Sequence, residues 1–405
     1  MTPRPAAGSA VAGMTMVTAG SMTANALSYL LALLAARWLG PAGYGEFAAL
    51  TAAQLVLAVP ALALQTVVAR DTVLGRDAAT LRRLGIRCTA IVAVVAAALV
   101  VPIATVLDTG VAATAAALLT APMLVLLAGE QGLLQGTGRF GVLAALLAVA
   151  GIGKVGPAIA VLLLGGGPGT ALTASAVGTG AVAVGARVLA GIAGGTDDAR
   201  RAIGVMAVLR ASQVQLALIV LSSVDVLLAR VVLGEEQAGQ YALGAVATKV
   251  AFWLPAAVGV VLYPRMASPE HSAGAVRSAL GVLVGIGAVT VAGAAVAAPL
   301  VPALLGEAYA PVRGLLWAFA LSGACLAVLQ GALLSAIARE RTALAAVAWL
   351  GLAVEVAVVL TAVTGMAQLI AVAATVAAVT AVAASLLVLR GAGRPAALAA
   401  PPAPS

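Results

Sequence analysis

The chain of 405 residues contains little charge, few aromatic residues, two cysteines and one histidine. Charged residues make up 9% of it, whereas soluble domains carry about 25%. So little charge excludes a water-soluble fold of this size. One histidine in a polar loop and two distant cysteines, Cys88 and Cys325, argue against a transition-metal centre. No Walker A motif and no catalytic triad can be assembled, so we expect no catalytic residues, no metal and no cofactor.

Apolar residues are abundant instead: they make up 63% of the chain, and the mean hydropathy is +1.14. Apolar stretches of about twenty residues recur throughout, as in helices that cross a bilayer. The sequence therefore predicts an all-α polytopic membrane protein with about twelve transmembrane helices. Their approximate limits are 16–39, 46–69, 84–107, 111–136, 140–164, 170–193, 204–233, 239–263, 275–298, 312–337, 343–364 and 367–389.

The basic residues gather in alternate connections between these helices. Sixteen of the 22 fall on one side of the predicted membrane, and only Arg37, Arg230 and Arg313 fall on the other. Because positive loops stay in the cytoplasm, we predict a multi-pass protein of the cytoplasmic membrane with both termini cytoplasmic. The pI of about 10.3 has the same origin. No basic patch is interleaved with aromatic residues, so we expect no nucleic-acid partner.

Similar segments recur about half a chain apart. Residues 36–44 (ARWLGPAGY) are similar to 229–241 (ARVVLGEEQAGQY), and 133–139 (LLQGTGR) to 333–339 (LLSAIAR). A proline follows each member of the first pair; these two, Pro60 and Pro255, are candidate hinges. Six helices per half give both halves one orientation, which predicts two parallel six-helix repeats around a central cavity. The predicted units are an N-terminal bundle at 1–197, a C-terminal bundle at 198–390 and a disordered cytoplasmic tail at 391–405.

These segments also carry a family resemblance. Residues 36–47 (ARWLGPAGYGEF) resemble the opening motif of polysaccharide and oligosaccharide flippases, the O-antigen translocase-like family of the multidrug/oligosaccharidyl-lipid/polysaccharide exporter (MOP) superfamily. Residues 225–241 with 262–265 (LYPR) resemble its middle motif, and 134–140 resemble its turn between the fourth and fifth helices. The resemblance covers the first eleven predicted helices in order.

The resemblance implies a function. It implies that the chain flips a polyprenyl-pyrophosphate-linked oligosaccharide across the cytoplasmic membrane for surface polysaccharide biosynthesis, by alternating access and without ATP hydrolysis. The partners would be this glycan substrate and the bilayer, with polysaccharide-assembly proteins as further candidates, and the chain would be monomeric. Aromatic residues are scarce, so stacking on sugars would fall to a few side chains such as Tyr29, Phe252 and Trp253.

Two other functions stay open. A multidrug or organic-cation antiporter of the same superfamily has the same architecture, but its cavity should be dominated by carboxylates. A scaffold in an envelope-assembly complex would need no cavity at all.

Ionisable residues inside the predicted helices are the main candidates for function. A charge there costs about 2.5–3.5 kcal/mol on insertion scales and is usually paired or functional. Asp225 and Lys249 lie at similar predicted depth on consecutive helices, so they form either a structural ion pair or a cavity-lining pair in which Lys249 meets a pyrophosphate. Glu130 and Lys154 are a looser counterpart in the first half. Glu355 has no partner nearby in the sequence, so it is protonated, paired across the bundle, or a coupling site for H⁺ or Na⁺.

Four further residues complete the candidate substrate-binding set. Arg210 either extends to the membrane interface or captures a lipid pyrophosphate with its guanidinium fork. Arg37 and Arg230 occupy matching repeat positions, where they anchor the interface or make the cavity mouth electropositive. Asn25 either bonds a neighbouring helix or lines the cavity.

Overall fold

The computed structural model describes residues 7–189, 205–266, 272–337 and 345–392, and all regular structure in these ranges is helical. The first half contains α1 (Ala7–Leu57), α2 (Val59–Val73), α3 (Ala78–Val106), α4 (Val111–Gly136), α5 (Phe140–Leu163) and α6 (Pro168–Leu189). The second half contains α7 (Val205–Leu221), α8 (Val224–Val232), α9 (Glu235–Met266), α10 (Ser272–Ala297), α11 (Leu300–Leu305), the 3₁₀ helix η2 (Glu307–Val312), α12 (Leu316–Ile337), α13 (Ala345–Ala362) and α14 (Met366–Ala392).

Local breaks explain why these helices do not map one to one onto the predicted spans. At Gly40, φ is 67° and ψ is 177°, so α1 contains the first span and the start of the second on either side of a kink. A residue with a Cβ would be strained in that backbone region. The second span then breaks at Ala58, and Pro60 lies in the first turn of α2. The seventh span is divided into α7 and α8 at Ser222 and Ser223.

Within the described ranges, nine helices are long and apolar enough to cross a membrane. One of them, Thr15–Val73, joins the first two predicted spans across the Gly40 kink. Neither α9 nor α13 is among the nine; α9 begins with two glutamates, and the apolar part of α13 is short. Each of the twelve predicted spans nevertheless coincides with a helix or a pair of helices. The all-α polytopic prediction is therefore confirmed.

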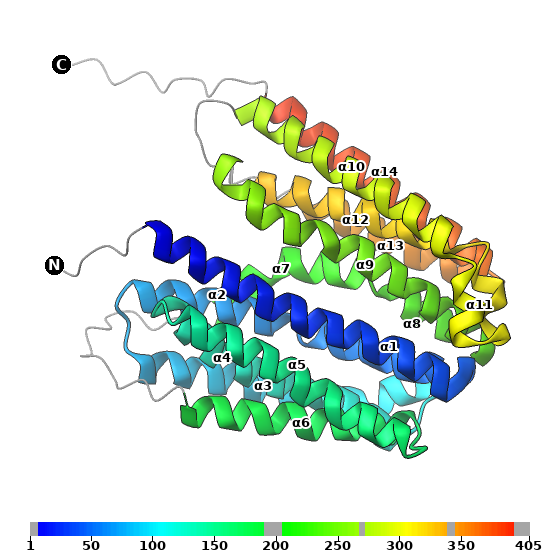
Figure 1. Ribbon diagram of the computed structural model, residues 1–405, viewed down its shortest axis with the longest axis horizontal. Coiled ribbons are helices and arrows are strands. Elements are labelled where there is room, and N and C mark those ends of the chain that lie inside the picture. Colours follow the sequence, from blue (N-terminus) through cyan, green and yellow to red (C-terminus); the bar gives the residue numbers. More distant parts are fainter. Residues whose placement is uncertain (1–6, 190–204, 267–271, 338–344, 393–405) are drawn as a thin grey trace.

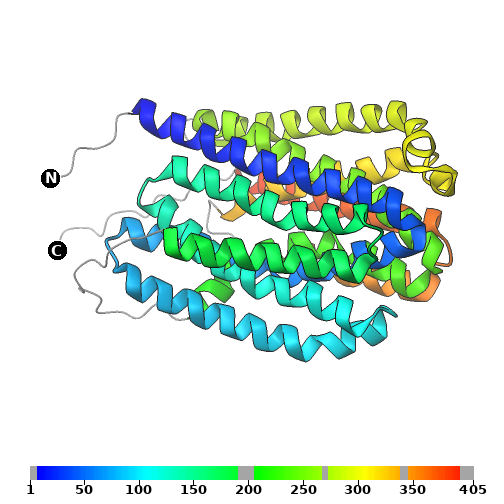
Figure 2. The ribbon, with the colours of Figure 1, turned by 60° about the horizontal axis from the view of Figure 1, so that its bottom comes forward.

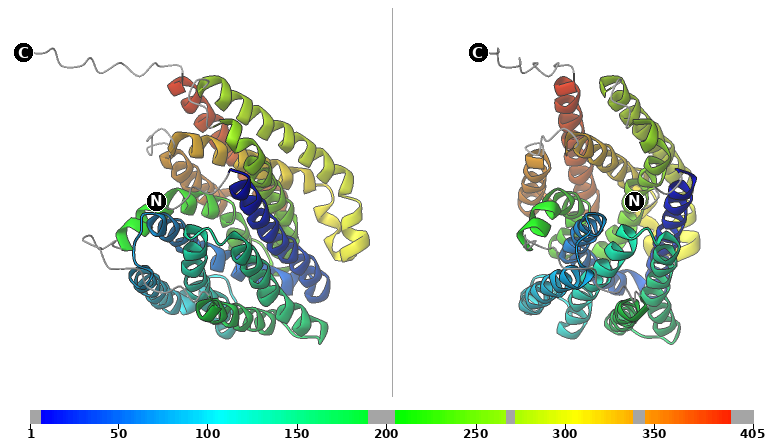
Figure 3. Two further views of the ribbon diagram at one scale, coloured as in Figure 1. Left: turned by 60° about the vertical axis from the view of Figure 1, so that its left-hand side comes forward. Right: turned by 90° about the vertical axis from the view of Figure 1, so that its left-hand side faces the viewer.

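The helices lie side by side along the long axis of the molecule (Figures 1 and 2). The start of α1 and the end of α14 lie at the same end of the molecule, which we call the proximal end. The opposite end, where α3 turns into α4 and where α11 and η2 lie, is the distal end. Viewed along the long axis, the helices of the first half gather below and those of the second half above (Figure 3, right).

Helix α1 joins the two halves, because it packs on α5 in its own half and on α9 in the other. The crossing of α1 with α9 depends on two glycines. A Cβ at Gly45 would lie 3.0 Å from the backbone nitrogen of Gly239, and a Cβ at Gly239 would overlap the carbonyl oxygen of Pro41. Small residues allow membrane helices to approach this closely. The buried side chains of Tyr44 and Tyr241 belong to one apolar core that extends across the crossing.

Part of the predicted organisation lies outside the described residues. The boundary between 197 and 198 falls in the undescribed range 190–204, so it stays a prediction. The predicted tail begins at 391, but α14 continues to Ala392, and the rest of the tail is not described.

Replacing Gly239 by alanine tests the α1–α9 crossing. The added methyl group must displace the Pro41 backbone, and overpacking of this kind costs about 1–3 kcal/mol. Gly239→Ala should therefore lower the unfolding temperature of the detergent-solubilised protein by several degrees. Gly234→Ala is the matched control, because a Cβ there meets nothing within 4 Å. Equal unfolding temperatures for the two variants would show that the crossing does not need a glycine.

Candidate functional site

A cavity of about 290 Å³ lies between the two halves. The first half supplies its wall from α1, α4, α5 and α6, and the second half supplies it from α8 and α9. The volume is at the lower end of the range for small-molecule sites, about 300–1,000 Å³. Its polar and aromatic lining residues are Asn25, Ser28, Tyr29, Tyr44, Phe47, Thr51, Gln54, Lys154, Ser175, Lys249 and Trp253.

Two lysines give the cavity its charge. Lys154 comes from α5 in the first half and Lys249 from α9 in the second, and both line the wall. Among the described residues, no aspartate or glutamate contributes to the wall. The wall therefore carries two basic side chains and, within the described part of the chain, no acidic one.

Aromatic residues border the same space. The hydroxyl of Tyr29 donates a 3.3 Å hydrogen bond to the backbone carbonyl of Lys249, which links α1 to α9. Trp253 lines the cavity, and Phe252 packs edge-on against it with ring centroids 5.0 Å apart. Phe252 is fully buried in the apolar core of the second half. Tyr29 and Trp253 thus lie where a ligand could stack, whereas Phe252 supports Trp253 from behind.

The structure places three of the nine candidate residues on the cavity wall: Asn25, Lys154 and Lys249. The side chains of Arg210 and of the hinge candidate Pro255 lie outside the described set. The remaining candidates lie elsewhere and have other partners.

Asp225 and Glu355 lie together inside the second half. Asp225 Oδ2 accepts a 2.8 Å hydrogen bond from the hydroxyl of Tyr241, and Oδ1 accepts one from the amide of Val226 at 2.9 Å. Glu355 lies on α13, which packs on α8, and is 2% exposed; within the described ranges its Oε1 has no hydrogen-bond partner. The predicted direct pairing of Asp225 with Lys249 is absent from the described ion pairs, and the carboxylate accepts a hydrogen bond from Tyr241 instead.

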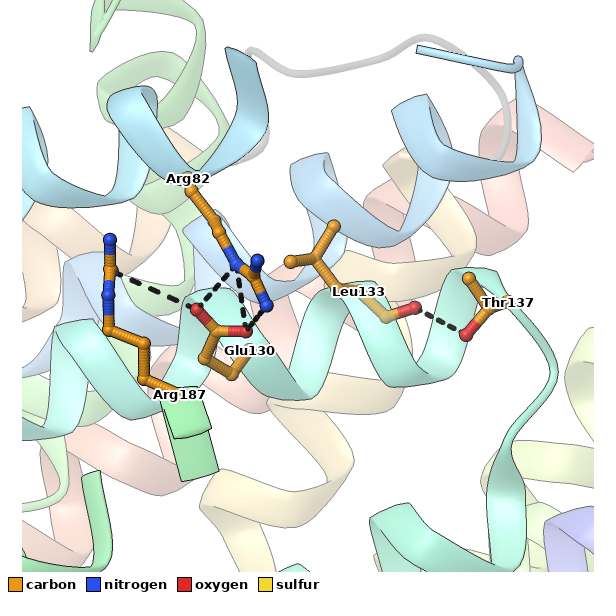
Figure 4. Close-up of polar contacts among 5 residues, drawn as sticks. All are labelled: Arg82, Glu130, Leu133, Thr137 and Arg187. Atoms are coloured by element: carbon orange, nitrogen blue, oxygen red, sulfur yellow. Dashed lines mark hydrogen bonds and ion pairs between the residues drawn. The ribbon is translucent and has the colours of Figure 1, made fainter. Parts of the chain in front are cut away.

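Glu130 is held by arginines of the first half rather than by Lys154 (Figure 4). Arg82 Nη2 donates to Oε2 at 3.0 Å and Nε donates to Oε1 at 3.1 Å, while Arg187 lies 3.9 Å from Oε1. Helices α3 and α6 pack on either side of α4 and bring both arginines to this carboxylate. Lys154 belongs to α5 and lines the cavity instead.

Arg37 and Arg230 lie at the distal end, outside the cavity lining. Arg37 Nη1 donates a hydrogen bond to the carbonyl oxygen of Leu304. Arg230 donates from Nε to the carbonyl of Leu107 at 2.9 Å, and from Nη2 to that of Asp108 at 3.0 Å. Carbonyls at helix ends lack partners within the helix, so the guanidinium groups satisfy them. The prediction of an electropositive cavity mouth at these residues does not match these contacts.

The nine candidate residues do not include several uncharged residues of the wall, namely Thr51, Gln54 and Ser175. The sequence carries one signal for them: Gln54 is an amide within an apolar helix, where it needs a polar surrounding. It is 4% exposed. Thr51 and Ser175 carry no such signal, because small hydroxyl residues are common wherever membrane helices pack.

Comparisons with known proteins show the fold. No family model and no curated protein matches the chain. Solved structures match nearly all of it, among them the following three. An inward-facing conformation of a multidrug resistance MATE family transporter of the MOP superfamily has a TM-score of 0.60 at 13% identity, with 94% of each chain covered. An outward-facing conformation of such a transporter has a TM-score of 0.54 at 15% identity, covering 94% of this chain and 95% of that one.

The third is a MOP superfamily transporter from Pyrococcus furiosus Vc1, described by a reverse polarity of its binding pocket that suggests a different function. It has a TM-score of 0.55 at 13% identity and covers 97% of this chain and all of its own. At such identities the similarity establishes a shared fold. These neighbours support the MOP superfamily fold; they do not add support for the narrower resemblance to polysaccharide flippases.

The ion pair at Glu130 predicts a difference between two neighbouring arginines. Arg82→Gln leaves the buried Glu130 carboxylate with Arg187 alone at 3.9 Å. Removing one partner of a buried pair costs about 3–5 kcal/mol, and the partial exposure of Arg82 reduces this. Arg83→Gln makes the same charge change at an exposed position. The unfolding temperature in detergent should fall clearly for Arg82→Gln only, and a similar loss for both would contradict the pairing.

Proposed function

We propose that the chain is a multi-pass membrane transporter that moves an anionic, lipid-linked substrate through the cavity between its halves. One observation carries this proposal: Lys154 from one half and Lys249 from the other face the same cavity, and no described carboxylate lines it. Two ammonium groups on opposite walls would neutralise a phosphate or pyrophosphate. The same groups would repel an organic cation.

Alternating access is the proposed mechanism. Two parallel halves with a substrate site between them are the arrangement in which one half rocks against the other. The fold similarity is higher to the inward-facing than to the outward-facing neighbour. This fits a chain that is closed at its distal end by the α1–α9 crossing. We assign the arginine-rich proximal end to the cytoplasm, in accord with the positive-inside rule.

The finer proposal for the substrate is a polyprenyl-pyrophosphate-linked oligosaccharide, flipped across the cytoplasmic membrane by a monomer. The motif resemblance at residues 36–47 supports it, and so does the chemistry of the wall. The lysines would hold the pyrophosphate, Tyr29 and Trp253 would contact the sugars, and the polyprenyl tail would stay in lipid. Polysaccharide-assembly proteins are candidate partners.

A multidrug exporter is the second candidate. The structural neighbours favour it, because two of those described above are multidrug resistance MATE transporters. The charge of the cavity favours the first candidate instead. Binding measurements with one anionic and one cationic ligand separate the two.

We further propose that Asp225 and Glu355 couple transport to H⁺ or Na⁺. The Oε1 atom of Glu355 is buried and has no hydrogen-bond partner among the described residues, which leaves it available to a cation. The seventh span breaks at Ser223, next to Asp225. Interrupted membrane helices offer unpaired backbone groups to ions. A cation here would also screen the repulsion between the two carboxylates.

The cavity lysines can be tested by calorimetry on the purified full chain in detergent, with undecaprenyl pyrophosphate as the anionic ligand and tetraphenylphosphonium as the cationic one. Each of Lys154→Gln and Lys249→Gln should weaken binding of the pyrophosphate about tenfold or more, since a hydrogen bond to a charged group contributes about 1.5–3 kcal/mol. Arg83→Gln removes the same charge at an exposed position outside the cavity and should leave binding unchanged.

Tighter binding of tetraphenylphosphonium by the lysine variants, without pyrophosphate binding by the native chain, would favour the multidrug exporter. Deletion of the gene provides an independent check in the cell. The flippase proposal expects polyprenyl-linked repeat units to build up, whereas unchanged glycan with altered drug sensitivity would contradict it.

The coupling proposal is tested in proteoliposomes with a fluorescent polyprenyl pyrophosphate and an imposed H⁺ or Na⁺ gradient. One of the two gradients should stimulate translocation by the native chain. Glu355→Gln should lose this stimulation and keep calorimetric binding of undecaprenyl pyrophosphate, because Glu355 is not on the cavity wall. Glu236→Gln, at an exposed distal position, is the control. Full stimulation in Glu355→Gln would exclude this residue from coupling.

A further inference from the structure

Two arginines at repeat-related positions of the distal end each contact the opposite half. The first lies in residues 36–44 and the second in residues 229–241, the segments that share the Ala-Arg sequence. Arg37 on α1 donates to the carbonyl of Leu304 in α11 of the second half. Arg230 on α8 donates to the carbonyls of Leu107 and Asp108 in the first half. The two contacts therefore run in opposite directions between the halves.

The acceptors are related by the same repeat. Leu107 and Asp108 connect α3 to α4, the third and fourth spans of the first half. Leu304 belongs to the connection between α10 and α12, the third and fourth spans of the second half. Each acceptor lies at the end of a helix, where carbonyls are unpaired and carry the negative end of the helix dipole. A guanidinium group donates hydrogen bonds to the unpaired carbonyls, and its positive charge interacts favourably with the negative end of the helix dipole.

Neighbouring bonds reinforce each contact. The hydroxyl of Tyr309 in η2 donates to the carbonyl of Ala36 at 2.8 Å, and Tyr309 is 1% exposed. Arg230 Nη2 also donates to Glu235 Oε1 at 3.0 Å, and its side chain is 5% exposed. The distal end is thus closed by polar bonds to backbone atoms as well as by the α1–α9 crossing.

We infer that Arg37 and Arg230 form a reciprocal latch that holds the distal end closed and must release on both sides when that end opens. Bonds within one half survive a rigid-body rotation of that half, whereas both of these bonds cross between the halves. Because the acceptors are backbone carbonyls, no side-chain substitution at Leu107, Asp108 or Leu304 removes them, so the latch is tested by changing the arginines. The inference rests on the alternating-access part of the proposed function.

The test is a pair of spin-label distances on the full chain in lipid nanodiscs, with Cys88 and Cys325 replaced by alanine. Labels at Leu164→Cys and Val296→Cys report the distal end, and labels at Leu74→Cys and Ser278→Cys report the proximal end; all four positions are exposed. Arg37→Gln/Arg230→Gln should raise the ratio of distally open to closed molecules about tenfold or more. The distal distance should lengthen and the proximal distance should shorten in the same molecules.

The exposed Arg37→Gln alone should give a smaller shift in the same direction, which keeps the test decisive if the double variant does not fold. Arg313→Gln removes an exposed arginine from the same end and should leave both distances unchanged. Unchanged distances in the latch variants, or distal lengthening without proximal shortening, would overturn the latch. One further result would overturn the latch but leave the proposed transport intact. In that result, undecaprenyl pyrophosphate shifts the native chain between distally closed and distally open states, whereas the latch variants do not respond.

Discussion

The close contact between α1 and α9 is the constraint from which the rest of the arrangement follows. Backbone meets backbone where Gly45 passes Gly239, and one apolar core with Tyr44 and Tyr241 continues through both halves. The cavity lies directly on the proximal side of this crossing, because the same two helices carry Tyr29 and Lys249. The crossing thus closes one end and positions a lysine of the second half opposite a lysine of the first.

Charges inside the bundle are few, and four of those that the structure describes have a separate physical solution to the cost of burial. Lys154 and Lys249 face a cavity. Glu130 receives the fork of Arg82, and Asp225 receives the hydroxyl of Tyr241. Glu355 differs from these, because one of its oxygens is buried and no described residue forms a hydrogen bond with it. A buried carboxylate oxygen whose cost of desolvation is not offset by a hydrogen bond is a candidate site for an ion that binds and is released.

The spans and the all-helical fold were predictable from the sequence, because hydropathy, Gly/Pro breaks and loop charge each depend on local stretches of the chain. The site was only partly predictable. Position along a helix gives depth, but not the direction in which a side chain faces. Glu130 could not be assigned to Arg82 because the two lie 48 residues apart and meet only when α3 packs on α4. The repeat did equate Arg37 with Arg230, but it could not reveal that each binds the opposite half.

The hydrogen bond of Tyr29 ends on the backbone carbonyl of Lys249 and not on its ammonium group. Any residue at this position would offer the same carbonyl. The link between the halves at the cavity is therefore independent of the side chain that gives the cavity its charge. A single substitution of Lys249 could therefore change which substrate the cavity accepts and leave the hydrogen bond between the halves in place. Fold and substrate selectivity can then change independently in evolution.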